Sequence, residues 1–379
     1  MTENKSGLVF TVSGREVQAY HPEPILLNIE VVPYTRKMEP QHAIDALKEG
    51  YSVLISDFYS SGLEVLATLK KFLRKQNNDP SFDGQRKFRA AYHDFSQRIL
   101  LIVRNQKLVV KKSPEIGWFE KFYPEYTEFL LPFSQVQGLN SSWQWYEKGM
   151  SIPGLKNKIH PWYGAYFPTR FDHLAIFDHW LKHYKGEKKS AIDIGTGCGV
   201  LSFLLLHCGF EKVYGTDTNP NAIIGLQEDI ERQKLESKMD LRFGDLFAGL
   251  RVKSELIVFN PPWLPASYQP EGIDTAVYYN ENLFPRFFEK AAKRLKPGGK
   301  LVILFSNLAQ ITNQSKHHPI EAELAGENRF RKEYLVRKKV KPASKKTTRD
   351  QHWRSSEMVE MWVLKMPTPE EPVKYFNGK

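Results

Sequence analysis

The chain has 379 residues, with 54 Lys and Arg against 43 Asp and Glu, so its formal net charge is +11. This length is enough for two domains, and the excess of cations favours a polyanionic partner such as RNA or DNA. Having only two cysteines, Cys198 and Cys208, excludes a disulfide framework and a zinc cluster. Without an apolar signal segment or a long uncharged run, we expect a cytoplasmic protein with no membrane contact.

Residues 1–150 carry no motif that assigns a function. The apolar run Ile99–Val103 predicts a strand, and the helical spacing of apolar residues over Leu63–Phe72 predicts a helix. We therefore expect a mixed α/β domain, which we assign to substrate recognition. Aromatic residues gather over Trp118–Trp162; we favour packing between two domains, and a platform for stacked nucleobases is the alternative.

From about residue 160, apolar strands alternate with helices. The predicted strands are Ala191–Ile194, Val213–Asp217, Leu241–Phe243, Leu256–Phe259 and Leu301–Phe305. Such alternation implies a doubly wound parallel sheet with helices on both faces. Two later runs, Phe330–Val336 and Met358–Leu364, predict a C-terminal antiparallel β-hairpin. We therefore expect a Rossmann-like α/β domain over residues 160–366 and a flexible tail over residues 367–379.

A glycine-rich loop follows the first of these strands and has the pattern Asp193-x-Gly195-x-Gly197-x-Gly199. A dinucleotide fingerprint that starts at Gly195 needs glycine at position 200, where this chain has Val200. The acidic Asp193, inside the strand, repels a pyrophosphate and suits a ligand with an ammonium group. S-adenosylmethionine has an ammonium group, a ribose and an adenine but no phosphate, so we expect this cofactor.

Aspartates lie at the ends of the next two strands. Asp217 follows the loop by about 20 residues, a position from which a carboxylate can accept both ribose hydroxyls. Asp245 can accept from the adenine amino group, with Leu246 or Phe247 against the adenine face. Acidic positions at three successive strand ends indicate a single ligand that lies across them.

The fourth strand stops at Asn260-Pro261-Pro262-Trp263, because neither proline has an N–H to donate to a neighbouring strand. Its amide and indole side chains should therefore be exposed at the edge where ligands bind in open α/β sheets. For this stretch alone, a strand terminator without further function is the alternative interpretation.

Together, these motifs resemble those of the class I S-adenosylmethionine-dependent methyltransferases. Asp193–Gly199 is similar to the first motif of that superfamily, and Phe167–Arg170 resembles the segment that closes over its cofactor. Asn-Pro-Pro-aromatic resembles the motif of amino-methyltransferases, which include the release-factor glutamine enzymes and the adenine or guanine enzymes of RNA and DNA. Trp263 departs from the usual Tyr or Phe, and Asn260–Ala266 resembles a small-domain methyltransferase group. The cofactor-binding residues that we expect are Phe167, Arg170, Asp193, Gly195, Thr196, Gly197, Gly199, Asp217, Thr218, Asp245, Leu246 and Asn260.

The expected chemistry is methyl transfer to a planar amino or amide nitrogen. Its lone pair is delocalised, so we expect the Asn260 side-chain oxygen and the Pro261 carbonyl to accept its two N–H groups and favour pyramidalisation. Trp263 can stack on the target and hold it in line with the methyl group. The catalytic residues that we expect are therefore Asn260, Pro261, Pro262 and Trp263, without a metal ion.

The acceptor that we favour is a base of a nucleic acid, RNA before DNA, because of the net charge and the basic connection Lys338–Arg349. A solvated loop is the alternative interpretation of that connection. A glutamine side chain of a protein is the second candidate acceptor, a small molecule the third, and a catalytically silent binding module the non-enzymatic alternative. His179 and His183 have the i, i+4 spacing of metal ligands, but without a third ligand we interpret them as surface histidines.

Overall fold

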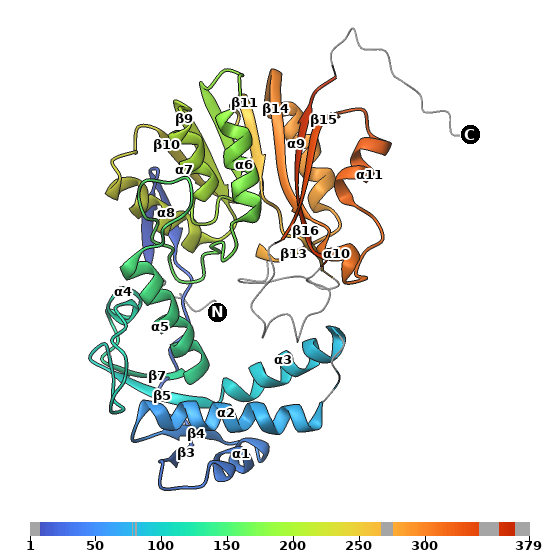
Figure 1. Cartoon of the computed structure of the whole chain (residues 1–379). Coiled ribbons are helices and arrows are strands. Elements are labelled where there is room, and N and C mark those ends of the chain that lie inside the picture. The colour runs from blue at the N-terminus through green and yellow to red at the C-terminus, as the bar shows by residue number, and fades with distance from the viewer. Residues whose placement is uncertain (1–7, 78, 80–81, 267–275, 341–355, 368–379) are drawn as a thin grey trace, which may run out of the picture. The chain divides into compact units, whose positions relative to one another are not determined.

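The computed structural model describes residues 8–77, 79, 82–266, 276–340 and 356–367. The chain divides into two compact units, which we describe separately (Figure 1): Met1–Ala19 with Gly149–Lys379, and Tyr20–Lys148. The first domain predicted from the sequence spans residues 1–150, whereas residues 8–19 belong to the larger unit. Apart from residue 367, the predicted tail lies outside the described residues.

The larger unit is built on a seven-stranded sheet with the strand order β10-β9-β8-β11-β14-β16-β15. Neighbours from β10 to β14 run parallel, and β16 runs antiparallel to both β14 and β15. This arrangement confirms the predicted Rossmann-like sheet with a C-terminal antiparallel hairpin. The bounds are β8 (Ser190–Ile194), β9 (Lys212–Asp217), β10 (Met239–Phe243), β11 (Ser254–Phe259), β14 (Leu295–Ser306), β15 (Arg331–Lys339) and β16 (Met358–Lys365).

The central strands are apolar because both faces of the sheet are covered, as parallel sheets require. All six residues of β11 are buried. Helices α6, α7, α8 and α9 pack against the sheet, and the short helices α10 and α11 follow β14 (Figure 1). Their bounds are α6 (Asp172–Lys182), α7 (Val200–His207), α8 (Pro220–Arg232), α9 (Leu283–Arg294), α10 (Leu308–Ile311) and α11 (Pro319–Gly326).

The strand order reverses between β8 and β11. From β8 the chain proceeds to β9 and β10 on one side, and β11 and β14 lie on the other side. At such a point the loops after the two central strands diverge and leave a crevice at their carboxyl ends, where open α/β sheets bind ligands. The glycine loop follows β8 and Asn260 follows β11, so both lie at this crevice.

An N-terminal hairpin, β1 (Val9–Val12) with β2 (Arg15–Gln18), packs on the α8 side of the same unit. The Phe10 ring meets Trp162 edge-on at 5.1 Å, and the Leu241 amide donates to Ser13 Oγ at 3.2 Å. Two short strands, β12 (Leu264–Pro265) and β13 (Tyr278–Tyr279), pair in parallel just beyond Trp263.

The smaller unit has a five-stranded sheet in the order β3-β4-β5-β6, with β7 also paired to β5, which confirms the predicted mixed α/β region. Its strands are β3 (Val31–Tyr34), β4 (Ser52–Ile55), β5 (Ile99–Arg104), β6 (Lys107–Leu108) and β7 (Glu128–Pro132). Its helices are α1 (Pro40–Lys48), α2 (Tyr59–Gln76), α3 (Phe82–Ser96), α4 (Trp118–Phe122) and α5 (Phe133–Lys148).

Aromatic rings of α4 and α5 form part of the core of this smaller unit. Trp118 is fully buried, stacks on Phe122 at 4.9 Å and meets Trp143 edge-on at 5.4 Å. Its indole N–H donates to Ser142 Oγ at 2.9 Å. The base-stacking interpretation is therefore wrong for Trp118 and Phe122, because both rings are inaccessible to a ligand.

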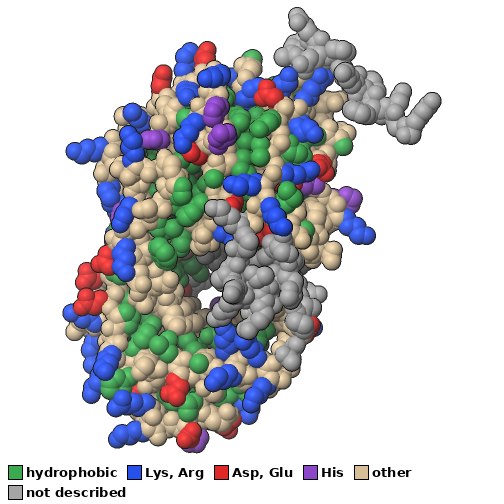
Figure 2. All heavy atoms as spheres, in the orientation of Figure 1, with side chains coloured by type: hydrophobic (Ala, Val, Ile, Leu, Met, Phe, Trp, Pro, Cys, Tyr) green, Lys and Arg blue, Asp and Glu red, His purple; other side chains and the backbone are tan. Residues whose placement is uncertain are grey.

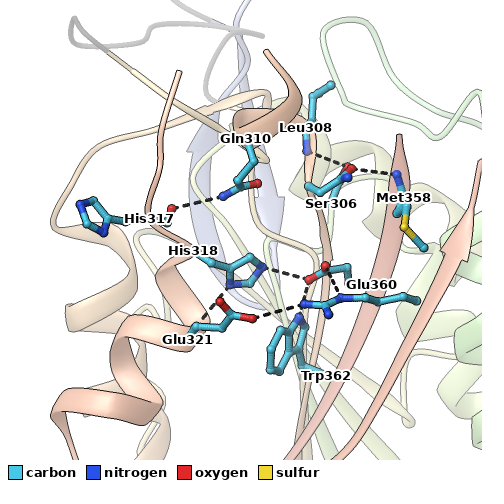
Figure 3. Close-up of polar contacts among 11 residues, drawn as sticks. Ser306, Leu308, Gln310, His317, His318, Glu321, Met358, Glu360 and Trp362 are labelled. Carbon is cyan, nitrogen blue, oxygen red and sulfur yellow. Dashed lines mark hydrogen bonds and ion pairs between the residues drawn. The ribbon is translucent and has the colours of Figure 1, made fainter. Parts of the chain in front are cut away.

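A buried carboxylate on β16 holds the C-terminal hairpin in the larger unit (Figure 3). Glu360 lies 2.9 Å from His318 Nε2 and accepts from Trp362 Nε1 at 2.8 Å and from Arg337 Nε at 2.9 Å. Burial alone would raise its pKa, but these hydrogen bonds hold the pKa of Glu360 below its ordinary value. The network therefore connects β15, β16 and α11, and it fixes the strand that begins at Met358.

Candidate active site

A cavity of about 380 Å³ opens at the carboxyl ends of β8, β9, β10 and β11. This volume lies within the range of small-molecule sites in proteins. The predicted site residues that line it are Gly195, Thr196, Gly197, Asp217, Thr218, Asp245, Leu246, Asn260, Pro261, Pro262 and Trp263. The structure therefore brings most of the predicted cofactor residues and all four predicted catalytic residues into one cavity.

The glycine loop requires glycine for two different reasons. Gly195, Gly197 and Gly199 all have positive φ angles, of 64°, 53° and 81°, which residues with a side chain rarely adopt. A Cβ at Gly199 would lie 2.3 Å from Leu226 Cδ1, so this glycine permits the close packing of α7 on α8. Gly199 is thus outside the cavity lining, whereas Gly195 and Gly197 form part of its wall.

Asp193 lies behind the loop. It is fully buried on β8, and its Oδ2 accepts from Thr196 Oγ1 at 2.9 Å and from Ser202 Oγ at 2.7 Å. Its Oδ1 has no partner among the described residues, and burial raises the pKa of Asp193 to about 7. The carboxyl group therefore ties the loop to the start of α7 and is not among the described residues that line the cavity.

Asp217, at the end of β9, faces the cavity. Its Oδ2 accepts from the Gly197 amide and its Oδ1 from the Asn219 amide, both at 2.8 Å. Burial raises its pKa, and these backbone N–H groups act in the opposite direction. Each oxygen retains a second lone pair, so the carboxylate can still accept the two hydroxyls of a ribose.

Asp245 follows β10 and is about half exposed, at 46% of its side-chain surface. It forms an ion pair with Arg286 of α9 and lies 3.7 Å from Lys290 Nζ. Both cations lie at Oδ2, so Oδ1 of this carboxylate can still accept from a ligand amino group. Next to it, Leu246 lines the cavity with its apolar side chain, whereas Phe247 is part of the core.

The Asn260–Trp263 segment closes the opposite side of the cavity. Asn260 follows β11 directly, and its Oδ1 accepts from the indole N–H of Trp263 at 3.3 Å. The oxygen that we expected to receive a target N–H is therefore engaged by the neighbouring indole. Pro261 and Pro262 between them also line the cavity.

The segment predicted to close over the cofactor, Phe167–Arg170, is divided between the main cavity and a smaller one. Arg170 lies outside the main cavity and lines a smaller one, where its Nη1 pairs with Glu357 Oε2 at 3.1 Å. Phe167 is absent from the described lining of both cavities, and its neighbours Tyr166 and Pro168 line the main one. The structure thus brings Tyr166, not Phe167, to the glycine loop, where a Cβ at Gly197 would lie 3.2 Å from the Tyr166 carbonyl oxygen.

His173 on α6 is a site residue that the sequence analysis missed. It is 3% exposed, lines both cavities and meets the Trp263 ring at right angles, with centroids 5.5 Å apart. Burial lowers the pKa of His173 to about 4, although Asp172 acts in the opposite direction, so the imidazole is neutral at pH 7. In the sequence, His173 stands next to the apolar residues of this helix. The histidine pattern that we considered there was the i, i+4 spacing of His179 and His183.

His179 and His183 lie on the outer side of α6. Their ring centroids are 4.7 Å apart, and His183 Nδ1 lies 2.8 Å from the His179 carbonyl oxygen. Within the described part of the chain, no group of three or more His, Cys, Asp or Glu side chains is arranged to hold a metal ion. Nor does any helix in the described ranges combine the length and apolar character needed to cross a bilayer.

Cations are numerous on the surface, as Figure 2 shows for one face. Lys338 and Lys339, exposed at the end of the edge strand β15, begin the predicted basic connection. Lys338 is paired with Val359 of β16, which in turn is paired with Ser306 at the carboxyl end of β14. This basic strand end therefore lies at the same edge of the sheet as the cavity. Beyond Val340 the connection lies outside the described residues until residue 356.

Comparisons with known proteins agree on this region of the chain. The family model described as "Methyltransferase small domain" matches residues 176–330, a segment that contains the glycine loop, the acidic strand ends and Asn260–Trp263. A putative protein N5-glutamine methyltransferase of Methanocaldococcus jannaschii is 30% identical over 167 residues, which cover 42% of this chain and 80% of that relative.

Two further relatives are similar over a smaller share of their length. A release factor glutamine methyltransferase of Moorella thermoacetica is 27% identical, covering 38% of this chain and 58% of the relative. A ribosomal RNA small subunit methyltransferase C of Alcanivorax borkumensis is 29% identical, covering 40% and 48%. The chain thus spans about half the length of these two relatives.

Proposed function

We propose that this chain, which belongs to the class I S-adenosylmethionine-dependent methyltransferases of the small-domain family, methylates a planar amino or amide nitrogen. The observation that carries the proposal is the position of Asn260: the residue lines the same cavity as the glycine loop, and its side-chain oxygen accepts an N–H donor. A neutral amide oxygen at this point suits a target that presents N–H groups.

The donor end of the cavity fits S-adenosylmethionine. Gly195 and Gly197 leave room for a ligand at the loop, and Asp217 retains lone pairs for ribose hydroxyls. Leu246 provides an apolar wall for an adenine, and Asp245 can accept from its amino group through Oδ1, because Arg286 pairs with Oδ2. No phosphate-binding cation lines the described cavity, which agrees with a ligand without phosphate. When bound, the cofactor supplies a methyl group on a positively charged sulfur.

At the acceptor end, the residues of the chain orient the nitrogen. Asn260 Oδ1 and the Pro261 carbonyl accept its N–H groups, and these bonds strengthen as positive charge develops on the nitrogen. Trp263 gives a flat surface for the target and keeps it aligned. With the cofactor bound, the nitrogen lone pair would form the new N–C bond while the electron pair of the broken C–S bond stays on sulfur, and the surplus proton would leave the nitrogen for water.

We favour RNA as the acceptor. The observation behind this choice is the exposed basic end of β15, at the same sheet edge as the cavity, in a chain with a net charge of +11. Phosphate contacts of this kind position a nucleic acid without reading its sequence. In this proposal the smaller unit, Tyr20–Lys148, recognises the substrate and the reaction takes place in the cytoplasm.

A glutamine side chain of a protein is the second candidate, because two of the relatives described above are named as glutamine methyltransferases. Its amide presents the same planar nitrogen to Asn260. The deciding experiment transfers tritiated methyl groups to a lysate of a strain that lacks the gene, and then separates RNA, DNA, protein and small molecules. Label in RNA supports our choice, label in protein supports the glutamine candidate, and no label in any fraction contradicts the proposed activity.

A further inference from the structure

A second, smaller cavity adjoins the main one. Its volume is about 170 Å³, and the two cavities share Tyr166, His173, Trp263 and Leu308 in their walls. The smaller one has none of the glycine loop or acidic strand ends among its described lining residues. It therefore begins at the catalytic segment and extends away from the expected donor.

The described walls of the small cavity contain two carboxylates and one cation. Glu357 has 5% of its side chain exposed and is neutralised by Arg170, and Asp172 adds a further carboxylate. Leu308 is held by a hydrogen bond from its amide to Ser306 Oγ at 3.2 Å (Figure 3). Such a wall disfavours a phosphate and suits a neutral group that has both donors and acceptors.

His173, a residue of the wall that the two cavities share, carries an unpaired polar atom. Its Nε2 is buried and has no hydrogen-bond partner among the described residues. A buried donor or acceptor without a partner costs roughly 1–3 kcal/mol, so such atoms are uncommon unless a ligand or water completes them. Its ring contacts Trp263, whose indole N–H reaches Asn260, so the imidazole is close to the catalytic segment.

A planar amino nitrogen always has a second heteroatom nearby, because its lone pair is delocalised into an adjacent C=N or C=O bond. Asn260 and Pro261 serve the N–H groups of that nitrogen, and neither of these two oxygens can donate to the adjacent heteroatom. A neutral imidazole that carries its proton on Nε2 can donate such a bond. The acceptor head group therefore needs a donor where His173 lies.

We propose that the small cavity receives the part of a nucleobase that lies beyond its amino group, and that His173 Nε2, in the wall shared with the main cavity, donates to the ring heteroatom next to the methylated nitrogen. This inference depends on the proposed function and deepens it. His173 is thus a positioning and specificity residue: it selects head groups with an acceptor beside the amino group, whereas the donor binds independently of it.

Three substitutions of His173 test this role. Gln places a polar atom at the distance of Nε2, Asn reaches only as far as Nδ1, and Phe keeps the ring against Trp263 without any polar atom. We expect H173N and H173F to lower kcat/KM for total RNA by about tenfold or more, as loss of a hydrogen bond of this kind does. H173Q should remain within about threefold of the natural enzyme. A matched control is H179F, which changes an exposed histidine on the same helix.

Two further measurements separate positioning from a structural role. The dissociation constant of S-adenosylmethionine, from calorimetry, should stay within about twofold for all variants, and the Tm of H173F should be unchanged or higher, because an unpaired buried polar atom is removed. Natural kcat/KM in H173F, or an equal loss in all three variants with a lower Tm, would overturn the inference. If the natural enzyme labels no RNA at all, the proposed function fails instead.

Discussion

The indole N–H of Trp263 donates to Oδ1 of Asn260 over 3.3 Å, so two residues of one short motif are hydrogen-bonded to each other across the prolines. A target N–H group that enters either takes the second lone pair of this oxygen or replaces the indole donor. Because one hydrogen bond is exchanged for another, the net cost is small. In the proposed mechanism, the indole N–H thus occupies one lone pair of the amide oxygen until the acceptor arrives.

The first prediction concerns this indole. W263F keeps an aromatic face but has no N–H to compete for Asn260, so its kcat/KM should equal or slightly exceed that of the natural enzyme. W263A should lose about 10- to 100-fold, because stacking on a base contributes roughly 1–3 kcal/mol. Steady-state rates of tritiated methyl transfer to RNA measure both. If W263F falls as far as W263A, the indole N–H has a direct role and does not compete.

The second prediction concerns the donor. Asp217→Ala removes the carboxylate that faces the cavity at the end of β9, and should raise the dissociation constant of S-adenosylmethionine by about 10- to 100-fold, since hydrogen bonds to a charged group contribute about 1.5–3 kcal/mol. Asp240→Ala, on the neighbouring strand and outside the cavity lining, is the control. Calorimetry compares the two, and an unchanged affinity in Asp217→Ala would remove its ribose role.

The third prediction concerns the pH dependence of stability. Burial raises the pKa of Asp193 from 3.8 to about 7. Between about pH 4 and pH 7 the folded protein thus holds a proton that the unfolded chain has released, so this group lowers stability as pH rises through that window. The shift of about three units corresponds to roughly 4 kcal/mol. Asp193→Asn should remove this term and therefore gain stability relative to the natural protein at pH 8.

Thermal unfolding from pH 5 to pH 8 checks this expectation. The difference in Tm between Asp193→Asn and the natural protein should grow with pH and level off above about pH 7. A difference that is constant with pH would show that Asp193 is ionised throughout. Thr196 and Ser202 can still donate to the amide oxygen of Asn, so the loop should keep its shape.

The fourth prediction concerns RNA. The double variant Lys338→Ala with Lys339→Ala should weaken RNA binding and reduce the slope of log affinity against log salt by about one for each phosphate contact that is lost. Lys189→Ala, just before the amino end of β8 and hence at the opposite edge of the sheet, should leave the slope unchanged. Filter binding over a range of salt concentrations gives these slopes, and equal slopes in both variants would exclude the end of β15 as a phosphate contact.

Much of the fold and of the donor side could be predicted from the sequence, because those signals are local. Alternating apolar runs defined the sheet, and the two central strand ends identified the crevice. The parts of the site that the sequence did not predict depend on contacts between segments that are distant in the chain. Glu357 meets Arg170 although 187 positions separate them, and Asp245 is engaged by Arg286 of a later helix. No local pattern indicates such pairs.

Side-chain direction was the other limit. Asp193 lies in the predicted strand, but its side chain turns toward Thr196 and Ser202 behind the loop. In the sequence, His173 lies beside apolar residues and so resembles a core residue. In the structure its ring contacts Trp263, and both residues line the cavity. A periodicity identifies the buried face of a helix, but it does not show which buried residue borders a cavity.

One measurement tests the central claim most directly: transfer of labelled methyl from S-adenosylmethionine by the natural enzyme and by Asn260→Ala, followed by hydrolysis and chromatography of the labelled product. We expect label on the nitrogen of a modified base, a loss of about 100-fold or more in Asn260→Ala, and an unchanged donor dissociation constant. Label on carbon, oxygen or sulfur, or a fully active Asn260→Ala enzyme, would contradict the account.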